Sequence, residues 1–427
     1  MTIELLQQVH LIDAVSGHDR TVDVLLHQGK IAAIESMIAP PSEAILWDAT
    51  DWVLGPGLVD LYSQSGEPGH EDREPLNAFL SAAIAGGFTQ VNLLPSTQPA
   101  IDSSMMLTGL QEQITHYASA YESLPQGMPL QVNCWAALTQ NTVGQQMVEW
   151  ADLQAAIGFT DGKPLTSLPM VRRILEYLQP SGKPVMLWAY HPGLAGNGVA
   201  REGTVALQLG LPGIPVMAEA VPLASLLELV REIGTPVHFM RIATARSVEL
   251  LQSAKSAGLP VTASTTWMHL CFATADLATY DPTLRLSPPV GNEVDRQALV
   301  QAVKTGVIDA IAVDHQAYTY EEKTVAFGEA PAGAIGLELV LPILWQRLVG
   351  TGQLTAVELW RSLSCQPLAC LGQPIAPLQI GDSNLILFDP TQSWQCDRST
   401  LKSAGDNTPF FGQPLQGRVI KTWRECA

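Results

Sequence analysis

Eight apolar, strand-like runs alternate with helical segments between Pro56 and Gly372, and this alternation limits the possible folds more than any other feature of the sequence. One helical segment, residues 76–84, has apolar side chains at i, i+3, i+4, i+7 and i+8 and stops at Gly86. Eight β/α alternations predict a TIM-type (β/α)8 barrel, in which any chemistry lies at the carboxyl ends of the strands. The eight runs are Leu58–Val59, Gln90–Leu94, Leu130–Ala136, Ala156–Thr160, Pro184–Ala189, Pro236–Met240, Pro260–Ala263 and Ala310–Val313.

The two ends of the chain have strand and hairpin patterns instead. Apolar runs separated by turn residues occupy residues 3–12, 21–26 and 31–34, and the same style returns at 385–388 and 417–422. Because chain termini often lie close together, we expect both ends to form one small β-sandwich domain beside the barrel, giving an α/β fold class. The predicted parts are residues 1–54 and 373–427 for the β domain and residues 55–372 for the barrel.

The composition excludes several classes of partner. The chain is 47% apolar and 15% charged, as expected for a well-packed globular protein. Its net charge of −18 repels nucleic acid and anionic membranes, and it has neither a leader-like segment nor a membrane-spanning apolar run. We therefore expect a cytoplasmic protein. Six cysteines without Cys-x-x-Cys spacing are expected to be reduced thiols: Cys134, Cys271, Cys365, Cys370, Cys396 and Cys426.

Several segments from about Ala49 onward carry a recognisable pattern. They are PGLVDLYSQSGEPG from Pro56, GFTQVNLLPSTQP from Gly87, GFTDGKP from Gly158, ARSVELLQSAKSAGLPVTA from Ala245, DAIAVDH from Asp309, EEKTVAFGEAPAG from Glu321 and NTPFFG from Asn407. In these segments the sequence resembles the dihydroorotases. The run that begins at Glu321 is more typical of dihydroorotases than of hydantoinases or allantoinases.

The resemblance implies an amidohydrolase-type barrel and, in active relatives, one or two zinc ions that generate hydroxide. The family's first strand carries D-x-H-x-H, and this chain has Tyr62 and Gln64 at the two histidine positions. The histidines expected after the fifth and sixth strands are Trp188 and Arg241. A phenol and a neutral amide are poor zinc ligands, and a fixed cation opposes metal binding.

Two ligand-type residues of the family do match, Asp161 after the fourth strand and Asp314 after the eighth. Two lone carboxylates make at best a weak site for a hard cation, so we expect neither a metal nor another cofactor. His315 could form a catalytic dyad with Asp314, but adjacent strand residues point to opposite faces, which favours a structural role. Asp314 remains the one candidate for a catalytic remnant.

Positions that hold the substrate in the family have changed as well. Gly66 stands where relatives carry an arginine for the substrate carboxylate, Ser96 and Ser287 replace asparagines, and Tyr318 replaces a histidine. These replacements predict a degenerate pocket within an intact scaffold. Its predicted residues are Tyr62, Gln64, Gly66, Ser96, Asp161, Trp188, Arg241, Ser287, Asp314 and His315.

Other conspicuous residues have structural interpretations. We expect His191 to be a loop histidine and not a substitute ligand, and Asp60 to cap backbone donors at the barrel rim. The run Glu321-Glu322-Lys323 is typical of a solvated loop or helix start. Trp188 and Trp267 are expected to fill volume that a metal and its solvent would otherwise occupy.

Dihydroorotase-like proteins without zinc histidines are known in the family, and some associate with aspartate carbamoyltransferase. The resemblance therefore implies that this chain is an inactive dihydroorotase homologue that supports the transferase. We expect the chain to form a homo-oligomer. Alternatives remain open: a cyclic-amide hydrolase of dihydroorotase, hydantoinase or allantoinase type with an altered site around Asp161, Asp314 and His315, a self-associating structural protein or small-ligand sensor, or an active dihydroorotase.

Overall fold

Seven parallel strands and one single-residue bridge form a closed barrel in the computed structural model, which describes residues 2–119 and 128–424. Backbone hydrogen bonds from Asp314 to Tyr62 (3.2 Å) and from Gln64 to His315 (2.8 Å) join the last strand to the first. The barrel strands are β6 (Leu58–Ser63), β7 (Phe88–Leu93), β8 (Gln131–Cys134), β9 (Val185–Trp188), β12 (Val237–Met240), β13 (Val261–Thr266) and β14 (Ala310–Ala312).

The fourth predicted strand, 156–160, is the exception. Within it, Phe159 alone bridges to Ala136 on one side and to Val185 on the other. Directly after the run, the Asp161 carboxylate accepts hydrogen bonds from the 138–139 backbone. The predicted strand thus has bridges only at Phe159, and backbone hydrogen bonds from Ile157 to Cys134 and from Thr160 to Ala136 (both 2.9 Å) continue the barrel wall.

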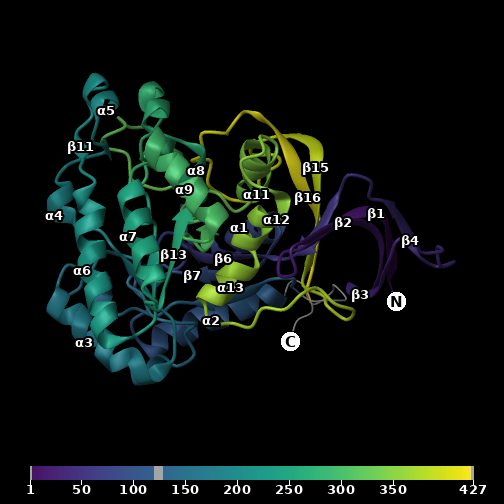
Figure 1. Ribbon diagram of the computed structural model, residues 1–427, viewed down its shortest axis with the longest axis horizontal. Helices are drawn as coiled ribbons and strands as arrows, with labels where there is room; N and C mark the ends of the chain where they lie inside the picture. Colours follow the sequence, from purple (N-terminus) through teal and green to yellow (C-terminus); the bar gives the residue numbers. More distant parts are fainter. Residues whose placement is uncertain (1, 120–127, 425–427) are drawn as a thin grey trace.

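Helices surround the barrel (Figure 1). Their apolar faces pack inward; in α3, for example, Val171, Ile174, Leu175 and Leu178 are buried. The longer helices are α1 (Leu76–Ala85), α2 (Ser104–Ser119), α3 (Leu168–Leu178), α6 (Met217–Ile233), α7 (Ala245–Ser256), α9 (Glu293–Thr305) and α12 (Ala356–Leu363). The shorter elements are α4 (Pro192–Ala195), β10 (Ala200–Arg201), α5 (Thr204–Gln208), β11 (Gly213–Ile214), α8 (Trp267–Cys271), α10 (Tyr320–Lys323), α11 (Val340–Leu344) and α13 (Cys365–Cys370).

Strands from both chain ends form a second unit, as predicted. They pair as one continuous seven-stranded sheet in the order β16-β15-β5-β1-β2-β3, with β4 on the same edge of β1 as β5. The predicted β-sandwich domain is thus present, and its seven strands are hydrogen bonded into one continuous sheet. These strands are β1 (Ile3–Asp13), β2 (His18–His27), β3 (Lys30–Glu35), β4 (Ile45–Asp48), β5 (Val53–Pro56), β15 (Leu385–Gln395) and β16 (Pro414–Trp423).

A buried carboxylate ties the two ends together. Glu4 of β1 accepts hydrogen bonds from Lys421 Nζ (2.7 Å) and from the indole N–H groups of Trp423 (3.1 Å) and Trp47 (3.2 Å). Charge-assisted hydrogen bonds of this kind offset the cost of burying the carboxylate. The N-terminal and C-terminal strands therefore share polar as well as apolar contacts.

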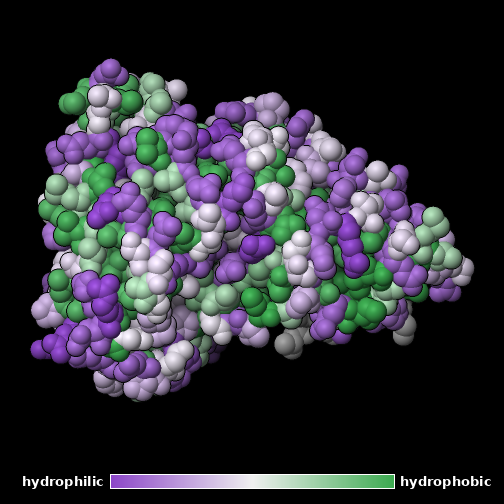
Figure 2. Space-filling view, viewed as in Figure 1, coloured by the Kyte–Doolittle hydropathy of each residue, from purple (hydrophilic) through white to green (hydrophobic). Residues whose placement is uncertain are grey.

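The change from β domain to barrel occurs within a few residues. β5 belongs to the end sheet and β6 to the barrel, with Gly57 between them. A Cβ atom at Gly57 would lie 2.1 Å from Thr89 Oγ1, so the close approach of β5 and β7 requires glycine here. In Figures 1 and 2 the barrel forms the broad lobe, and the terminal strands form the narrower lobe.

The predictions about thiols and membrane spans can be compared with the structure. Five cysteines are free thiols, and the sixth, Cys426, lies outside the described residues. Among residues 2–119 and 128–424, none of the helices combines the length and apolar character needed to cross a bilayer.

Candidate functional site

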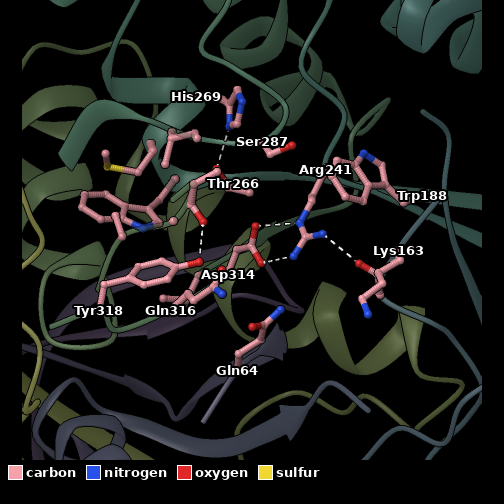
Figure 3. A pocket seen from close by; sticks show the side chains of 18 residues that line it. Gln64, Lys163, Trp188, Arg241, Thr266, His269, Ser287, Asp314, Gln316 and Tyr318 are labelled. Carbon is pink, nitrogen blue, oxygen red and sulfur yellow. Dashed lines mark hydrogen bonds and ion pairs between the residues drawn. The ribbon is translucent and has the colours of Figure 1, made fainter. Parts of the chain in front are cut away.

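A cavity of about 220 Å³ opens at the carboxyl ends of the barrel strands (Figure 3). Five of the ten predicted pocket residues line it, and the other five lie outside its lining. The lining residues are Gln64, Trp188, Arg241, Ser287 and Asp314. The residues outside the lining are Tyr62, Gly66, Ser96, Asp161 and His315.

The floor of the cavity is an ion pair between Arg241 and Asp314. Arg241 Nη2 lies 2.6 Å from Asp314 Oδ1, and Nε lies 2.7 Å from Oδ2. Arg241 Nη1 also donates to the Gly162 carbonyl (3.0 Å), and the guanidinium lies 4.6 Å from the centroid of the Trp188 ring. Burial acts to lower the pKa of Arg241, but Asp314 more than offsets this and raises it. Arg241 therefore stays charged.

Both residues of the pair have an unusual backbone conformation. Arg241 follows β12 with φ 58°, and Asp314 follows β14 with φ 52°. Non-glycine residues adopt this left-handed region at some energetic cost, which the surrounding structure must offset. The conformation turns both side chains from their strand ends into the cavity, as Figure 3 shows.

Tyr62 lies below the cavity as part of the barrel core and is fully buried. Its hydroxyl accepts from the Arg241 backbone N–H (3.1 Å) and hydrogen bonds with Ser264 Oγ (3.0 Å). Ser264 in turn hydrogen bonds with His238 Nε2 (2.8 Å). Burial raises the pKa of the Tyr62 phenol well above its usual value, so the phenol is a neutral packing group at this position.

Gly66 is enclosed by its own loop. A Cβ atom there would lie 2.3 Å from the His70 carbonyl oxygen and 2.5 Å from that of Glu74. Any larger side chain, including arginine, would require the 66–74 loop to move. The position expected to bind a substrate carboxylate is therefore lost in backbone geometry as well as in residue type.

Asp161 faces away from the cavity. Its carboxylate accepts from the backbone N–H groups of Leu138 (2.8 Å) and Thr139 (2.9 Å) and from Thr139 Oγ1 (2.5 Å). Asp60 likewise accepts from Ser63 Oγ (2.6 Å) and the Val313 backbone (2.8 Å). Both carboxylates hold backbone segments together, which corrects the expectation that Asp161 belongs to the pocket.

His315 points to the opposite side of β14 from Asp314. Its Nδ1 accepts from the Gly336 backbone (3.1 Å), so the ring proton is on Nε2, 2.8 Å from the Glu74 carboxylate. This buried pair fastens the barrel to the 66–74 loop. His191 has a local role as well, since its Nδ1 accepts from the Leu194 backbone (3.2 Å) at the start of α4.

The remaining predicted residues surround the cavity. Gln64 Nε2 donates to Ser96 Oγ (3.3 Å), and the Tyr318 hydroxyl donates to the Ala332 carbonyl (3.0 Å). Trp188 and Trp267 both line the cavity, yet it remains open, so these rings fill the vacated volume only in part.

The run 321–323 is less solvated than predicted. It does begin a helix, α10, but Glu322 forms an ion pair with Arg73 (2.5 Å). Lys323 is buried, and its Nζ donates to the carbonyls of Pro282 (3.1 Å) and Pro331 (2.7 Å). Burial lowers the pKa of Lys323 to about 7.

Sequence reasoning missed several lining residues, among them Lys163, Thr266, His269 and Gln316. Lys163 stands two residues after Asp161 in the GFTDGKP segment, which is the one signal that could have indicated it. His269 hydrogen bonds with Thr266 Oγ1 (2.7 Å) and with the Pro288 carbonyl (3.1 Å). Burial lowers the pKa of His269 to about 4, so it is neutral near pH 7.

Comparison with known proteins identifies the family. A protein named "Probable dihydroorotase-like protein" from Synechocystis sp. is 46% identical over 435 residues, covering 97% of this chain and 98% of that protein. A dihydroorotase from Syntrophus aciditrophicus is 34% identical over 98% of this chain and 97% of its own length. The chain belongs to the dihydroorotase family.

The fold of this dihydroorotase homologue is also that of hydantoinases. The L-hydantoinase of Arthrobacter aurescens matches with a TM-score of 0.81 and 20% identity, covering 100% of this chain and 96% of that chain. A D-hydantoinase matches with a TM-score of 0.78 and 18% identity over 100% of this chain and 94% of its own. No model of a protein family matches the chain.

The residues of this dihydroorotase homologue do not fit the zinc that the family implies. The positions of the expected histidines hold a buried phenol, an amide, an indole and a guanidinium, and the Asp314 carboxylate is already paired with that guanidinium. Within the described residues, no group of three or more His, Cys, Asp or Glu side chains is arranged to hold a metal ion.

Proposed function

We propose that this dihydroorotase homologue is catalytically inactive and acts as a structural or regulatory partner of aspartate carbamoyltransferase. The observation that carries the first part is the Arg241–Asp314 ion pair. A metal ion at the barrel mouth would need the Asp314 carboxylate, but Arg241 holds both of its oxygens. Arg241 brings a permanent positive charge to that position, which repels a divalent cation.

The enclosed loop at Gly66 supports the same conclusion from the substrate side. The resemblance places a carboxylate-binding arginine at this position, and the His70 and Glu74 carbonyls leave no room for one. This chain would therefore lack both the metal that supplies hydroxide and the arginine that binds the substrate carboxylate in the family.

Exposed apolar side chains support a partner. Leu194, Val216, Met217 and Val221 are 36–53% exposed on α4 and the start of α6, two helices that pack together. Leu207 on neighbouring α5 is 80% exposed. Grouped exposed apolar side chains are typical of surfaces that bind another protein.

The first experiment measures zinc content and dihydroorotate turnover on the same never-chelated sample. We expect zinc far below one ion per chain and no turnover. Stoichiometric zinc with turnover would overturn the proposal. Turnover of a hydantoin or another cyclic amide that disappears in Asp314→Ala would favour the alternative, a cyclic-amide hydrolase with an altered site.

The second experiment tests the partner. The tagged chain is purified from its native cell, and aspartate carbamoyltransferase is quantified in the eluate. We expect co-purification, reduced by Met217→Glu on α6 and retained by the control Met105→Glu, which places the same charge on an exposed site of α2. Absence of the transferase from the wild-type eluate would contradict the partner assignment.

A further inference from the structure

We propose that a buried anion-binding site lies behind the cavity wall, where Arg201 and Arg285 hold a carboxylate or phosphate group of a small ligand. This site is on the opposite side of the Trp188 ring from the Arg241–Asp314 pair. It is separate from the position at Gly66 where the family resemblance places a substrate carboxylate.

Arg201 is a buried charge that forms no ion pair within the described residues. The residue, which ends β10, is 1% exposed. Its Nη1 makes two long hydrogen bonds of 3.4 Å to the carbonyls of Ile214 and Pro215, whereas Nε and Nη2 have no partner. Buried polar groups are nearly always hydrogen bonded, and a buried charge is normally paired. Unpaired donors of this kind indicate a missing acceptor.

Arg285 supplies a second guanidinium, which is partly buried and has one unsatisfied donor. Its Nη1 donates to the Leu286 carbonyl (2.9 Å), but its buried Nε has no partner. None of the ion pairs among the described residues includes Arg201 or Arg285. Two guanidinium groups with unsatisfied donors and no ion pair favour a ligand with negative oxygens, which such groups bind in preference to neutral acceptors.

Tyr190 and Trp188 place this region beside the cavity. The charges of Arg201 and Arg285 both act on the Tyr190 hydroxyl, whose pKa burial nevertheless raises. The Tyr190 ring stacks on Trp188 at 5.1 Å, and Trp188 lines the cavity. The Trp188 indole N–H is another buried donor without a partner. Unsatisfied donors therefore come from three separate segments of the chain.

A protein carboxylate does not already fill this role. Glu219 is the acidic group whose charge acts on both Arg201 and Tyr190. However, its oxygens accept from the Ala243 backbone (3.2 Å), the Thr244 backbone (3.1 Å) and Thr244 Oγ1 (2.8 Å). Glu219 is committed to the turn before α7 and leaves the Arg201 donors free.

The charge distribution supports an anionic ligand. In a chain with 23 basic and 41 acidic residues, Lys163 lines the cavity, and Lys323 stands close enough to Arg285 for the two charges to interact. Converging positive charges attract anions even when the whole protein is negative. Neither Arg201 nor Arg285 lines the 220 Å³ cavity, so the volume of that cavity does not set the size of the ligand.

The test uses calorimetric titration of the full chain, after exchange into a chloride buffer, with sodium phosphate and separately with sodium succinate at constant ionic strength. We expect saturable binding of one of them, which identifies phosphate or carboxylate as the preferred group. Arg201→Met should weaken that binding by about 10- to 100-fold, since it removes charge-assisted hydrogen bonds. The matched control Arg246→Met removes an exposed arginine of α7 and should bind as the wild type does.

Arg201→Lys and Arg285→Gln keep the test valid if Arg201→Met does not fold. Each should weaken binding, with Arg201→Lys the milder because it retains the charge. No saturable binding of either anion, or equal binding by wild type and the Arg201 and Arg285 variants, would overturn the proposal. The result is independent of zinc content and dihydroorotate turnover, so this site and the proposed function can fail separately.

Discussion

The Arg241 guanidinium and the Asp314 carboxylate meet through two hydrogen bonds of 2.6 and 2.7 Å, although 73 residues separate them in the chain. The Arg241 side chain is 6% exposed and that of Asp314 19%. The pair joins the ends of β12 and β14 across the barrel mouth, where an amidohydrolase would otherwise need open metal ligands. The pair therefore links the ends of two barrel strands where the family resemblance places metal ligands.

Asp314→Asn should destabilise the protein, because it leaves the Arg241 charge buried and unpaired. We expect a loss of about 2–4 kcal/mol in the free energy of unfolding, measured by urea denaturation. The control Glu176→Gln breaks an exposed pair with Arg172 and should change stability by less than about 0.5 kcal/mol. Equal effects of the two substitutions would show that the buried pair has no special role.

Gly66→Ala tests whether the 66–74 loop is closed against side chains. The added Cβ would lie 2.3 Å from the His70 carbonyl oxygen, so we expect a loss of about 1–3 kcal/mol in thermal or urea unfolding. Gly109→Ala is the matched control, because Gly109 lies in α2 with no atom within 4 Å of the added Cβ. That substitution should stabilise the helix by up to about 1 kcal/mol. A neutral Gly66→Ala would mean that the loop opens readily.

His238 should make stability depend on pH. Burial, together with Lys255, lowers the pKa of its imidazole to about 3, below the value of 6.5 for an unfolded histidine. The contribution of neutral His238 to the free energy of unfolding is therefore fully present above pH 6.5. It is lost as pH falls, because only the unfolded state then takes up the proton. Between pH 7 and pH 5 the wild type should lose about 2 kcal/mol more than His238→Gln.

Comparing the pH dependence of unfolding free energy in wild type and His238→Gln separates the effect of His238 from that of groups whose pKa shifts in the other direction. Burial raises the pKa of Asp60 to about 7, so this carboxyl stabilises the folded state below pH 4 and loses that effect as pH rises toward 7. Parallel pH profiles for wild type and His238→Gln would contradict the prediction.

Asp161→Ala should affect stability and not metal content. The substitution leaves the buried N–H groups of Leu138 and Thr139 without their acceptor, so we expect a loss of about 2–4 kcal/mol in urea denaturation. Zinc content by elemental analysis should be the same in variant and wild type. A drop in bound zinc would instead assign Asp161 a ligand role.

The barrel could be predicted from the sequence because its strands are buried apolar runs flanked by helices of clear period. The run 156–160 has the same composition, yet only Phe159 pairs. The residue after this run, Asp161, binds a turn 22–23 residues earlier through its carboxylate. Such a long-range contact leaves no periodic signal.

The candidate site, too, could be predicted only in part from the sequence. Family motifs indicated which residues stand at the strand ends, including Trp188 and Arg241 in place of histidines. They could not indicate that Asp161 faces outward or that Gly66 is enclosed, since side-chain direction depends on loop geometry. Arg201 gave no signal at all, because it lies in a two-residue strand and its unpaired state exists only in the folded chain.

The position of β5 also affects how the protein is made. Residues 53–56 pair with residues 385–388, so this edge of the end sheet has no partner until the last tenth of the chain leaves the ribosome. An unpaired strand edge is a template for association with other nascent chains. β1 to β5 can pair with one another early, but the edge of β5 that pairs with β15 stays open until residues 385–388 have been made.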